Sequence, residues 1–199
     1  MDAKERESLI DQYEDGFQAI AAALEGITTA ELEAREAPGE WSPREIIHHL
    51  ADSEMNAAFR VRQLIAQDAP TLIGYDQEAF VRRLYADRPI EPSLAAFQAA
   101  RAATAPLLRR LSEDEWRRTG THTEVGPYSV EDWLRSYGPH AHDHADQIRR
   151  ARATAGDGTK GVKGDKGEET ANQQVGRREP TTRSQQPTAN RQWPRADSR

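Results

Sequence analysis

The sequence of 199 residues contains no cysteine, and this absence excludes several kinds of chemistry. No disulfide can form, no cysteine can act as a nucleophile, and no metal can be held by thiolates. The sequence also lacks the run of about 18 apolar residues that a membrane-spanning helix requires, and residues 1–7 are charged rather than apolar. We therefore expect a cytoplasmic protein with no membrane partner.

Large apolar side chains are scarce in the last part of the chain. Mean hydropathy is −0.88 and charged residues make up 30% of the sequence, and the apolar deficit is concentrated in residues 155–199, which are rich in Gly, Lys, Gln, Arg and Pro. Such a segment cannot bury enough apolar surface to offset the chain entropy lost on folding. The sequence therefore predicts one domain at residues 1–154 and a disordered low-complexity tail at residues 155–199.

Charge is distributed unevenly between these two parts. The whole chain carries −6, and because residues 155–199 carry +3, residues 1–154 carry −9. An acidic domain argues against nucleic acid as the main partner, since nucleic-acid binding depends on positive charge. We expect a small-molecule substrate instead.

The pattern of apolar residues predicts four long helices. Apolar side chains recur at spacings of three and four over residues 4–24, 42–66, 93–111 and 129–153. The clearest start is at Ser42, Pro43 and Glu45, which supply a capping hydroxyl, a proline at the first position and a carboxylate at the third. Strand alternation is absent, although residues 119–128 look like a loop or small hairpin. We predict an all-α four-helix bundle, in which the long connection at residues 70–92 allows a crossover.

Two histidines stand on one face of the last predicted helix. His140 and His144 are four residues apart, so their rings lie one above the other at the inward stripe, whereas His142 points away from it. A single inward histidine is usually a hydrogen-bonded core residue. A stacked pair needs two sets of partners or one shared cation. Pro139, directly before the pair, should kink the helix or alter the geometry of the ligands.

The second predicted helix offers a third metal ligand. His49 lies at the edge of its apolar face, whereas His48 projects nearly opposite the core. Together, His49, His140 and His144 would form a site with open coordination positions for water or substrate. Imidazole ligands suit several transition metals. We expect one divalent ion, with zinc or nickel preferred and iron or manganese as alternatives.

Polar residues follow His49 along the same helix. Ser53, Asn56 and Arg60 form a stripe that could contact the substrate, and the guanidinium of Arg60 suits an anionic group. The alternative is an ordinary polar helix flank.

Three carboxylates are candidates for proton transfer. Glu54 lies near the centre of the apolar face, where an ionised carboxylate is costly unless it is paired. Glu54 could therefore be a catalytic proton acceptor, or it could pair with an arginine, and the sequence leaves both interpretations open. Asp52 and Asp143 are further candidates to accept a proton or to orient a ligand.

The residues around these histidines resemble the DinB-like superfamily, and more closely its YfiT-like branch. The resemblance rests on residues 41–56, with the sequence WSPREIIHHLADSEMN, and on residues 140–144, HAHDH. Residues 74–76, GYD, match in character, and the similar region covers about residues 5–153. Gly138 and Pro139, directly before the first ligand of the HxxxH pair, depart from the family pattern.

The resemblance implies both a fold and an activity. Members are bundles with a divalent metal held by three histidines, often dimeric, and the positions that match here are His49, His140 and His144. The family is described as metal-dependent hydrolases and as transferases for low-molecular-weight thiols. Three neutral imidazoles favour deprotonation of a bound water or thiol, which suits either reaction. A non-catalytic metal-binding bundle with a stress or protein-interaction role is the alternative.

Overall fold

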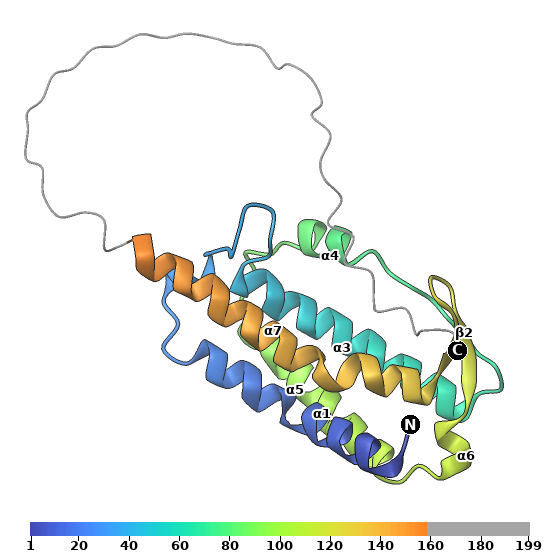
Figure 1. Ribbon diagram of the computed structural model, residues 1–199. Coiled ribbons are helices and arrows are strands. Elements are labelled where there is room, and N and C mark those ends of the chain that lie inside the picture. The colour runs from blue at the N-terminus through green and yellow to red at the C-terminus, as the bar shows by residue number, and fades with distance from the viewer. Residues whose placement is uncertain (159–199) are drawn as a thin grey trace, which may run out of the picture.

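The computed structural model describes residues 1–158. Within this part, the four predicted long helices are present as α1 (Ala3–Leu24), α3 (Pro43–Ala66), α5 (Glu91–Leu108) and α7 (Val130–Gly158) (Figure 1). Three short helices lie in the connections: α2 (Thr29–Leu32), α4 (Gln77–Arg83) and α6 (Glu113–Trp116). The prediction of an all-α four-helix bundle is confirmed.

The last helix, α7, continues through residues 155–158 and so extends past the predicted end of the domain at residue 154. The rest of the predicted disordered tail, residues 159–199, lies outside the described residues. None of the helices in residues 1–158 is long and apolar enough to cross a membrane.

The start of α3 has the contacts that the sequence predicts. The Ser42 side chain accepts a hydrogen bond from the backbone N–H of Glu45, and Glu45 Oε2 accepts one from the Ser42 backbone N–H at 2.8 Å. Pro43 occupies the first position, where its missing N–H is harmless. These contacts fix where α3 begins, and so determine which face of the helix carries His49.

The long helices pack in the cyclic order α1, α7, α3, α5. In Figure 1, α1 and α7 run in one direction while α3 and α5 run in the other. An ion pair at 3.1 Å between the Met1 amino group and Glu131 joins the starts of α1 and α7. Because α3 and α5 are parallel, the connection between them must return along the bundle, and the predicted crossover is confirmed.

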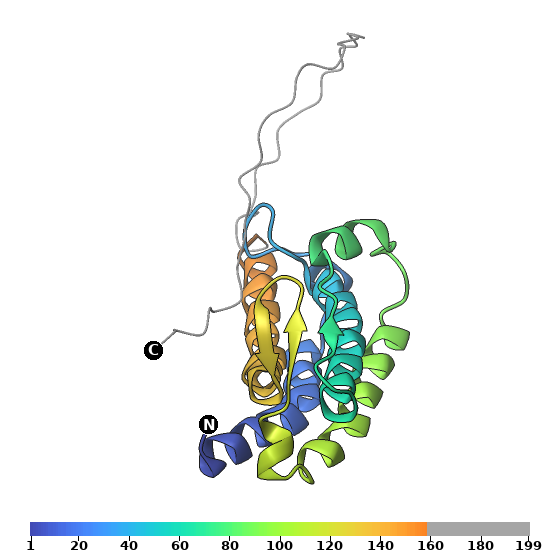
Figure 2. The ribbon, with the colours of Figure 1, turned by 90° about the vertical axis from the view of Figure 1, so that its right-hand side faces the viewer.

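A small sheet lies at the end of the bundle where α3 ends and α7 begins (Figure 2). Strands β2 (Thr119–His122) and β3 (Gly126–Ser129) form the antiparallel hairpin that the sequence suggests at this position. Strand β1 (Thr71–Leu72), in the crossover connection, pairs with β2 in parallel. The sequence analysis missed β1, because a strand of two residues has no alternation to detect.

Buried apolar side chains fill the bundle in two clusters. One surrounds Trp133 and Leu64 near the sheet, and the other surrounds Phe97 and Ile148 toward the opposite end. Buried polar residues of α3 lie among these clusters, and they include His49 of the predicted site.

Candidate metal site

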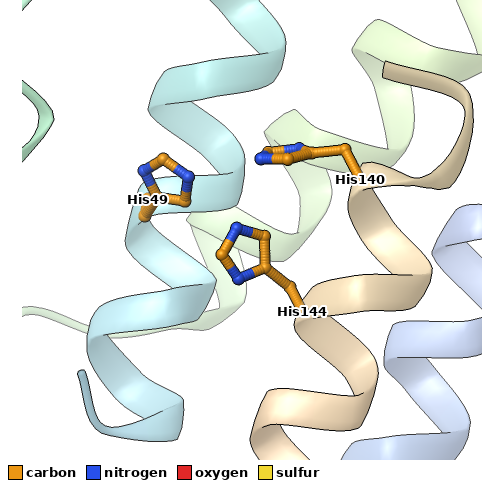
Figure 3. A group of neighbouring side chains, drawn as sticks. All are labelled: His49, His140 and His144. Atoms are coloured by element: carbon orange, nitrogen blue, oxygen red, sulfur yellow. The ribbon is translucent and has the colours of Figure 1, made fainter. Parts of the chain in front are cut away.

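Three histidines from two helices converge between α3 and α7 (Figure 3). His49 comes from α3, and His140 and His144 come from successive turns of α7. One ring nitrogen of each histidine lies within 4.8 Å of the other two. The ring centroids are 5.5 Å apart for His49 and His140, 5.0 Å for His49 and His144, and 4.6 Å for His140 and His144. The structure thus brings together the three residues that the sequence selects as ligands.

Pro139 does not turn the histidines away from each other. Helix α7 runs through Pro139 without a break, and the two rings that follow it both face His49 (Figure 3). Gly138 allows this part of α7 to lie close to α1, since a Cβ atom there would be 3.1 Å from the Leu9 carbonyl oxygen. The Gly-Pro pair is therefore compatible with three converging rings.

Burial favours the neutral form of all three imidazoles. His49 is only 2% exposed, and burial lowers its pKa well below the usual value, with a further contribution from His144. Burial likewise lowers the pKa of His140 well below its usual value. Burial lowers the pKa of His144 to about 4, against an opposing hydrogen bond from Gln147. A divalent cation needs neutral rings with available lone pairs, so this donor set fits such an ion.

Gln147 sets the tautomer of His144. His144 Nδ1 lies 2.9 Å from Gln147 Oε1, and because an amide oxygen can only accept, Nδ1 carries the proton. The Nε2 atom of His144 is then the one with a lone pair. A hydrogen bond of this kind commonly orients a metal-binding histidine.

Trp41 packs beside the same group. Its ring centroid lies 4.6 Å from that of His49 and 6.3 Å from that of His144. Trp41 immediately precedes the cap of α3, so the contacts that start the helix also position this ring against the site.

Glu54 is paired with an arginine, one of the two interpretations that the sequence leaves open. Glu54 Oε2 lies 2.9 Å from Arg101 Nε, and both side chains are almost fully buried. The hydroxyl of Tyr13 donates to the other carboxylate oxygen. Arg101 also donates to the carbonyl oxygens of Tyr13 at 2.6 Å and Tyr137 at 3.0 Å. With both carboxylate oxygens engaged, the geometry favours a structural role for Glu54 over proton transfer.

Two of the three residues in the predicted polar stripe point inward. Ser53 is 1% exposed and Arg60 7% exposed. Arg60 donates to the carbonyl oxygen of Ile73 and, at 3.4 Å, to the hydroxyl of Tyr137. Asn56 instead binds its own helix, since its Nδ2 donates to the Asp52 carbonyl oxygen at 2.8 Å.

The other candidate carboxylates lie at the margin of the bundle. Asp52 is partly buried and lies 3.8 Å from Arg88 Nη2. Burial raises its pKa, while the charge of Arg88 opposes the rise. Asp143 is exposed on α7.

The prediction that His48 projects away from the core is wrong. His48 is 2% exposed, and its Nδ1 lies 2.8 Å from Ser93 Oγ at the start of α5. The physical reason is that α3 is covered on two sides, by α7 and by α5, whereas a helical wheel identifies one apolar face. His142, as expected, stays outside the three-histidine group, with Nε2 at 3.1 Å from the Gln12 carbonyl oxygen of α1.

Several neighbours of the site were not selected from the sequence for a role there: Trp41, Tyr75 and Gln147. Gln147 follows His144 by three residues, so helical spacing alone could have identified their contact. Tyr75 lies in the crossover connection, where no periodicity indicates which way a side chain points. The Tyr137 ring also lies beside the site, 5.7 Å from that of His140.

Comparison with known proteins gives a consistent result. Residues 12–148 match the family model described as the DinB superfamily. A protein of Oceanobacillus iheyensis named "Putative metal-dependent hydrolase" is 31% identical over 139 residues, which cover 70% of this chain and 81% of that protein. YfiT of Bacillus subtilis, with the same description, is 28% identical over 148 residues, covering 73% of this chain and 83% of YfiT.

The fold also matches a solved structure. YfiT from Bacillus subtilis aligns with a TM-score of 0.73 and 25% sequence identity, covering 78% of this chain and 90% of YfiT. That protein is described as a probable metal-dependent hydrolase with an unusual four-helix bundle topology.

Proposed function

Because this chain belongs to the DinB superfamily, we propose that it is a divalent-metal-dependent enzyme acting on a small molecule. One observation carries the proposal: His49, His140 and His144 each place a ring nitrogen within 4.8 Å of the other two. Neutral imidazoles suit zinc or nickel best, with iron or manganese as alternatives. We further propose a homodimer, on the strength of the family resemblance, and a cytoplasmic location, as expected from a sequence without a long apolar run.

The residues of the chain prepare the site in separate ways. Gln147 fixes the proton of His144 on Nδ1 and leaves Nε2 to bind the ion. Trp41 packs on His49 and restricts its ring. A bound divalent ion would lower the pKa of a water or a thiol beside it, which makes a nucleophile at neutral pH.

We assign Glu54 a positioning role. Its ion pair holds Arg101, and Arg101 in turn binds the carbonyl oxygen of Tyr137, three residues before His140. The pair therefore ties α3 and α5 to the part of α7 that presents the metal ligands. The substrate would instead meet Ser53 and Arg60, which border the histidines.

Metal content tests the proposal most directly. After incubation with zinc or nickel and desalting, elemental analysis of the wild-type protein should give one ion per chain. Replacing His49, His140 or His144 by Ala should weaken binding by about 100-fold or more, since each removes a ligand. The control is His142→Ala, whose ring faces α1. If the wild-type protein binds none of zinc, nickel, iron or manganese, the proposal is wrong.

Hydrolysis and thiol transfer differ in the nucleophile, so they can be separated by assay. Ester, amide and electrophile substrates would be tested with the metal-loaded protein, with and without a low-molecular-weight thiol. Turnover that requires the thiol supports an S-transferase, and turnover in water alone supports a hydrolase. Metal binding without turnover on the whole panel would support the alternative of a non-catalytic bundle with a stress or interaction role.

A further inference from the structure

Among residues 1–158, one buried arginine forms no ion pair. Arg6, Arg60 and Arg101 are the buried arginines of residues 1–158. Arg6 forms ion pairs with Glu113 and Glu131, and Arg101 pairs with Glu54. No carboxylate among the described residues forms an ion pair with Arg60, which donates only to the Ile73 carbonyl oxygen and the Tyr137 hydroxyl. A buried cation without a counter-charge is costly, so this position suits an anion that is supplied from outside the chain.

Two buried hydroxyl groups near Arg60 also have no hydrogen-bond partner in the described part of the chain. Ser53 Oγ and the Tyr75 hydroxyl oxygen are buried, and neither has a hydrogen-bond partner within residues 1–158. The guanidinium carbon of Arg60 lies 5.8 Å from the centroid of the Tyr75 ring. Burial raises the pKa of Tyr75, as do Tyr137 and Asp52, whereas the Ser53 hydroxyl and the charge of Arg60 lower it, so these groups surround the same hydroxyl. Each hydroxyl can donate to an anion beside the guanidinium.

These donors border the three histidines. The Tyr137 hydroxyl accepts from Arg60, and the Tyr137 ring lies 5.7 Å from the ring of His140. Ser53 follows His49 by one turn of α3, a rise of about 6 Å along the helix. The long side chain of Arg60 leans back toward the start of α3, as helical side chains do. An anion held by these groups would therefore lie a few bonds from an atom at the histidine site.

We propose that Arg60, Ser53 and Tyr75 form a subsite for a carboxylate group of the substrate. The substrate would then be a small organic acid, or a molecule whose carboxylate lies a short spacer away from the reacting atom. A carboxylate is planar and carries one negative charge, which matches one guanidinium and two hydroxyl donors, whereas a phosphate dianion would exceed that charge. The link to a reaction rests on the proposed function, but binding of the anion does not.

The test compares an acid with its neutral amide in the absence of metal. Wild-type protein is treated with EDTA and desalted, and the loss of metal is checked by elemental analysis, so that no ion can bind the ligand. Calorimetric titration at neutral pH then measures the affinity for phenylacetate and for phenylacetamide. We expect phenylacetate to bind about tenfold more tightly or better, since a charge-assisted hydrogen bond distinguishes the two.

Variants of two arginines on α3 show which side chain causes the preference for phenylacetate. Arg60→Gln should abolish the preference for phenylacetate, and Arg60→Lys should retain part of it. Arg62→Gln is the matched control, because Arg62 binds Thr104 Oγ1 at 3.0 Å on the α5 side, and it should retain the whole preference. Circular dichroism checks that each variant is folded. If Arg60→Gln does not fold, the comparison of phenylacetate and phenylacetamide in the wild-type protein still tests whether a carboxylate is preferred.

Several outcomes would overturn the inference. They are equal affinity of the wild-type protein for both probes, no binding of phenylacetate in the millimolar range, or a preference that persists in folded Arg60→Gln protein. Tighter binding of inorganic phosphate than of phenylacetate would overturn the assignment to a carboxylate. Metal binding, measured after a portion of each preparation is reloaded with zinc or nickel, separates this inference from the proposed function. Wild-type protein that binds metal but shows no preference for phenylacetate defeats only the subsite, and wild-type protein that shows the preference but binds no metal defeats only the metal site.

Discussion

At the scale of single residues, burial determines what each histidine can do. His49, His140 and His144 lie together inside the bundle, where burial favours the neutral ring. Their convergence was predictable, because helical spacing places the HxxxH pair on one face and His49 at an apolar edge. The burial of His48 was not, since it depends on α5, a helix whose position the spacing within α3 does not specify.

The lowered pKa values make the metal-free protein sensitive to acid. Burial brings the pKa of His144 to about 4 in the folded state, from an ordinary value of 6.5. Between these values the unfolded chain binds more protons than the folded chain, so the free energy of unfolding falls as the pH falls. Urea unfolding of metal-free protein across this interval should show the decline, and His144→Gln should make it less steep. A decline of the same steepness in the variant would contradict the assignment.

At the scale of elements, α1 approaches α5 and α7 at a glycine. A Cβ atom on Gly16 would collide with Nη1 of Arg101 and would lie 2.8 Å from the Cβ atom of Ala141. Arg101 cannot move aside easily, because Nη1 donates to the Tyr13 carbonyl oxygen at 2.6 Å and Nε is bound to Glu54. The absence of a side chain at residue 16 is therefore a requirement of the packing between these helices.

Substitution of Gly16 should expose this requirement. Gly16→Ala should destabilise the protein by about 2 kcal/mol, the usual scale for inserting a methyl group into a packed core. Gly156→Ala is the control, since a Cβ atom there meets nothing within 4 Å. It should be neutral or stabilising by up to about 1 kcal/mol, because alanine favours helix. Urea unfolding measures both values, and a Gly16→Ala protein as stable as the control would show that the helices can separate at low cost.

The elements were predictable where their signals are local. The capping residues at Ser42 define the start of α3, and apolar spacing defines its length. Strand β1 and the parallel direction of α3 and α5 were harder to predict from the sequence, because both arise from contacts between distant segments. The same holds for Tyr75, which reaches Arg60 from a connection without periodicity. The sequence indicated the possibility of a crossover through the length of that connection, but not the side chains it would deliver.

At the scale of the whole molecule, the candidate site joins two helices that are distant in the sequence. A metal ion bound by His49 of α3 and by His140 and His144 of α7 would bind the folded state and not the unfolded chain. Such binding stabilises a protein by about 2.7 kcal/mol when the free ion is present at 100 times its dissociation constant. The ion should therefore raise the melting temperature of the entire domain.

Melting curves with and without metal test this coupling. Addition of zinc or nickel to EDTA-treated and desalted protein should raise the melting temperature, and removal of the ion should reverse the change. The His142→Ala protein should respond as the wild type does, whereas His49→Ala should show little or no rise. An equal rise in both variants would mean that the ion acts somewhere other than the three-histidine site.

The order of the three histidines along the chain also affects how the candidate site forms during synthesis and folding. His49 belongs to an early helix and its two partners to the last one, with the crossover, α5 and the hairpin between them. A newly synthesised chain cannot assemble the trio until α7 has emerged and docked, and the closure of that long intervening loop carries an entropy cost. Capture of the ion would then mark the end of maturation, and incompletely synthesised chains would remain without it.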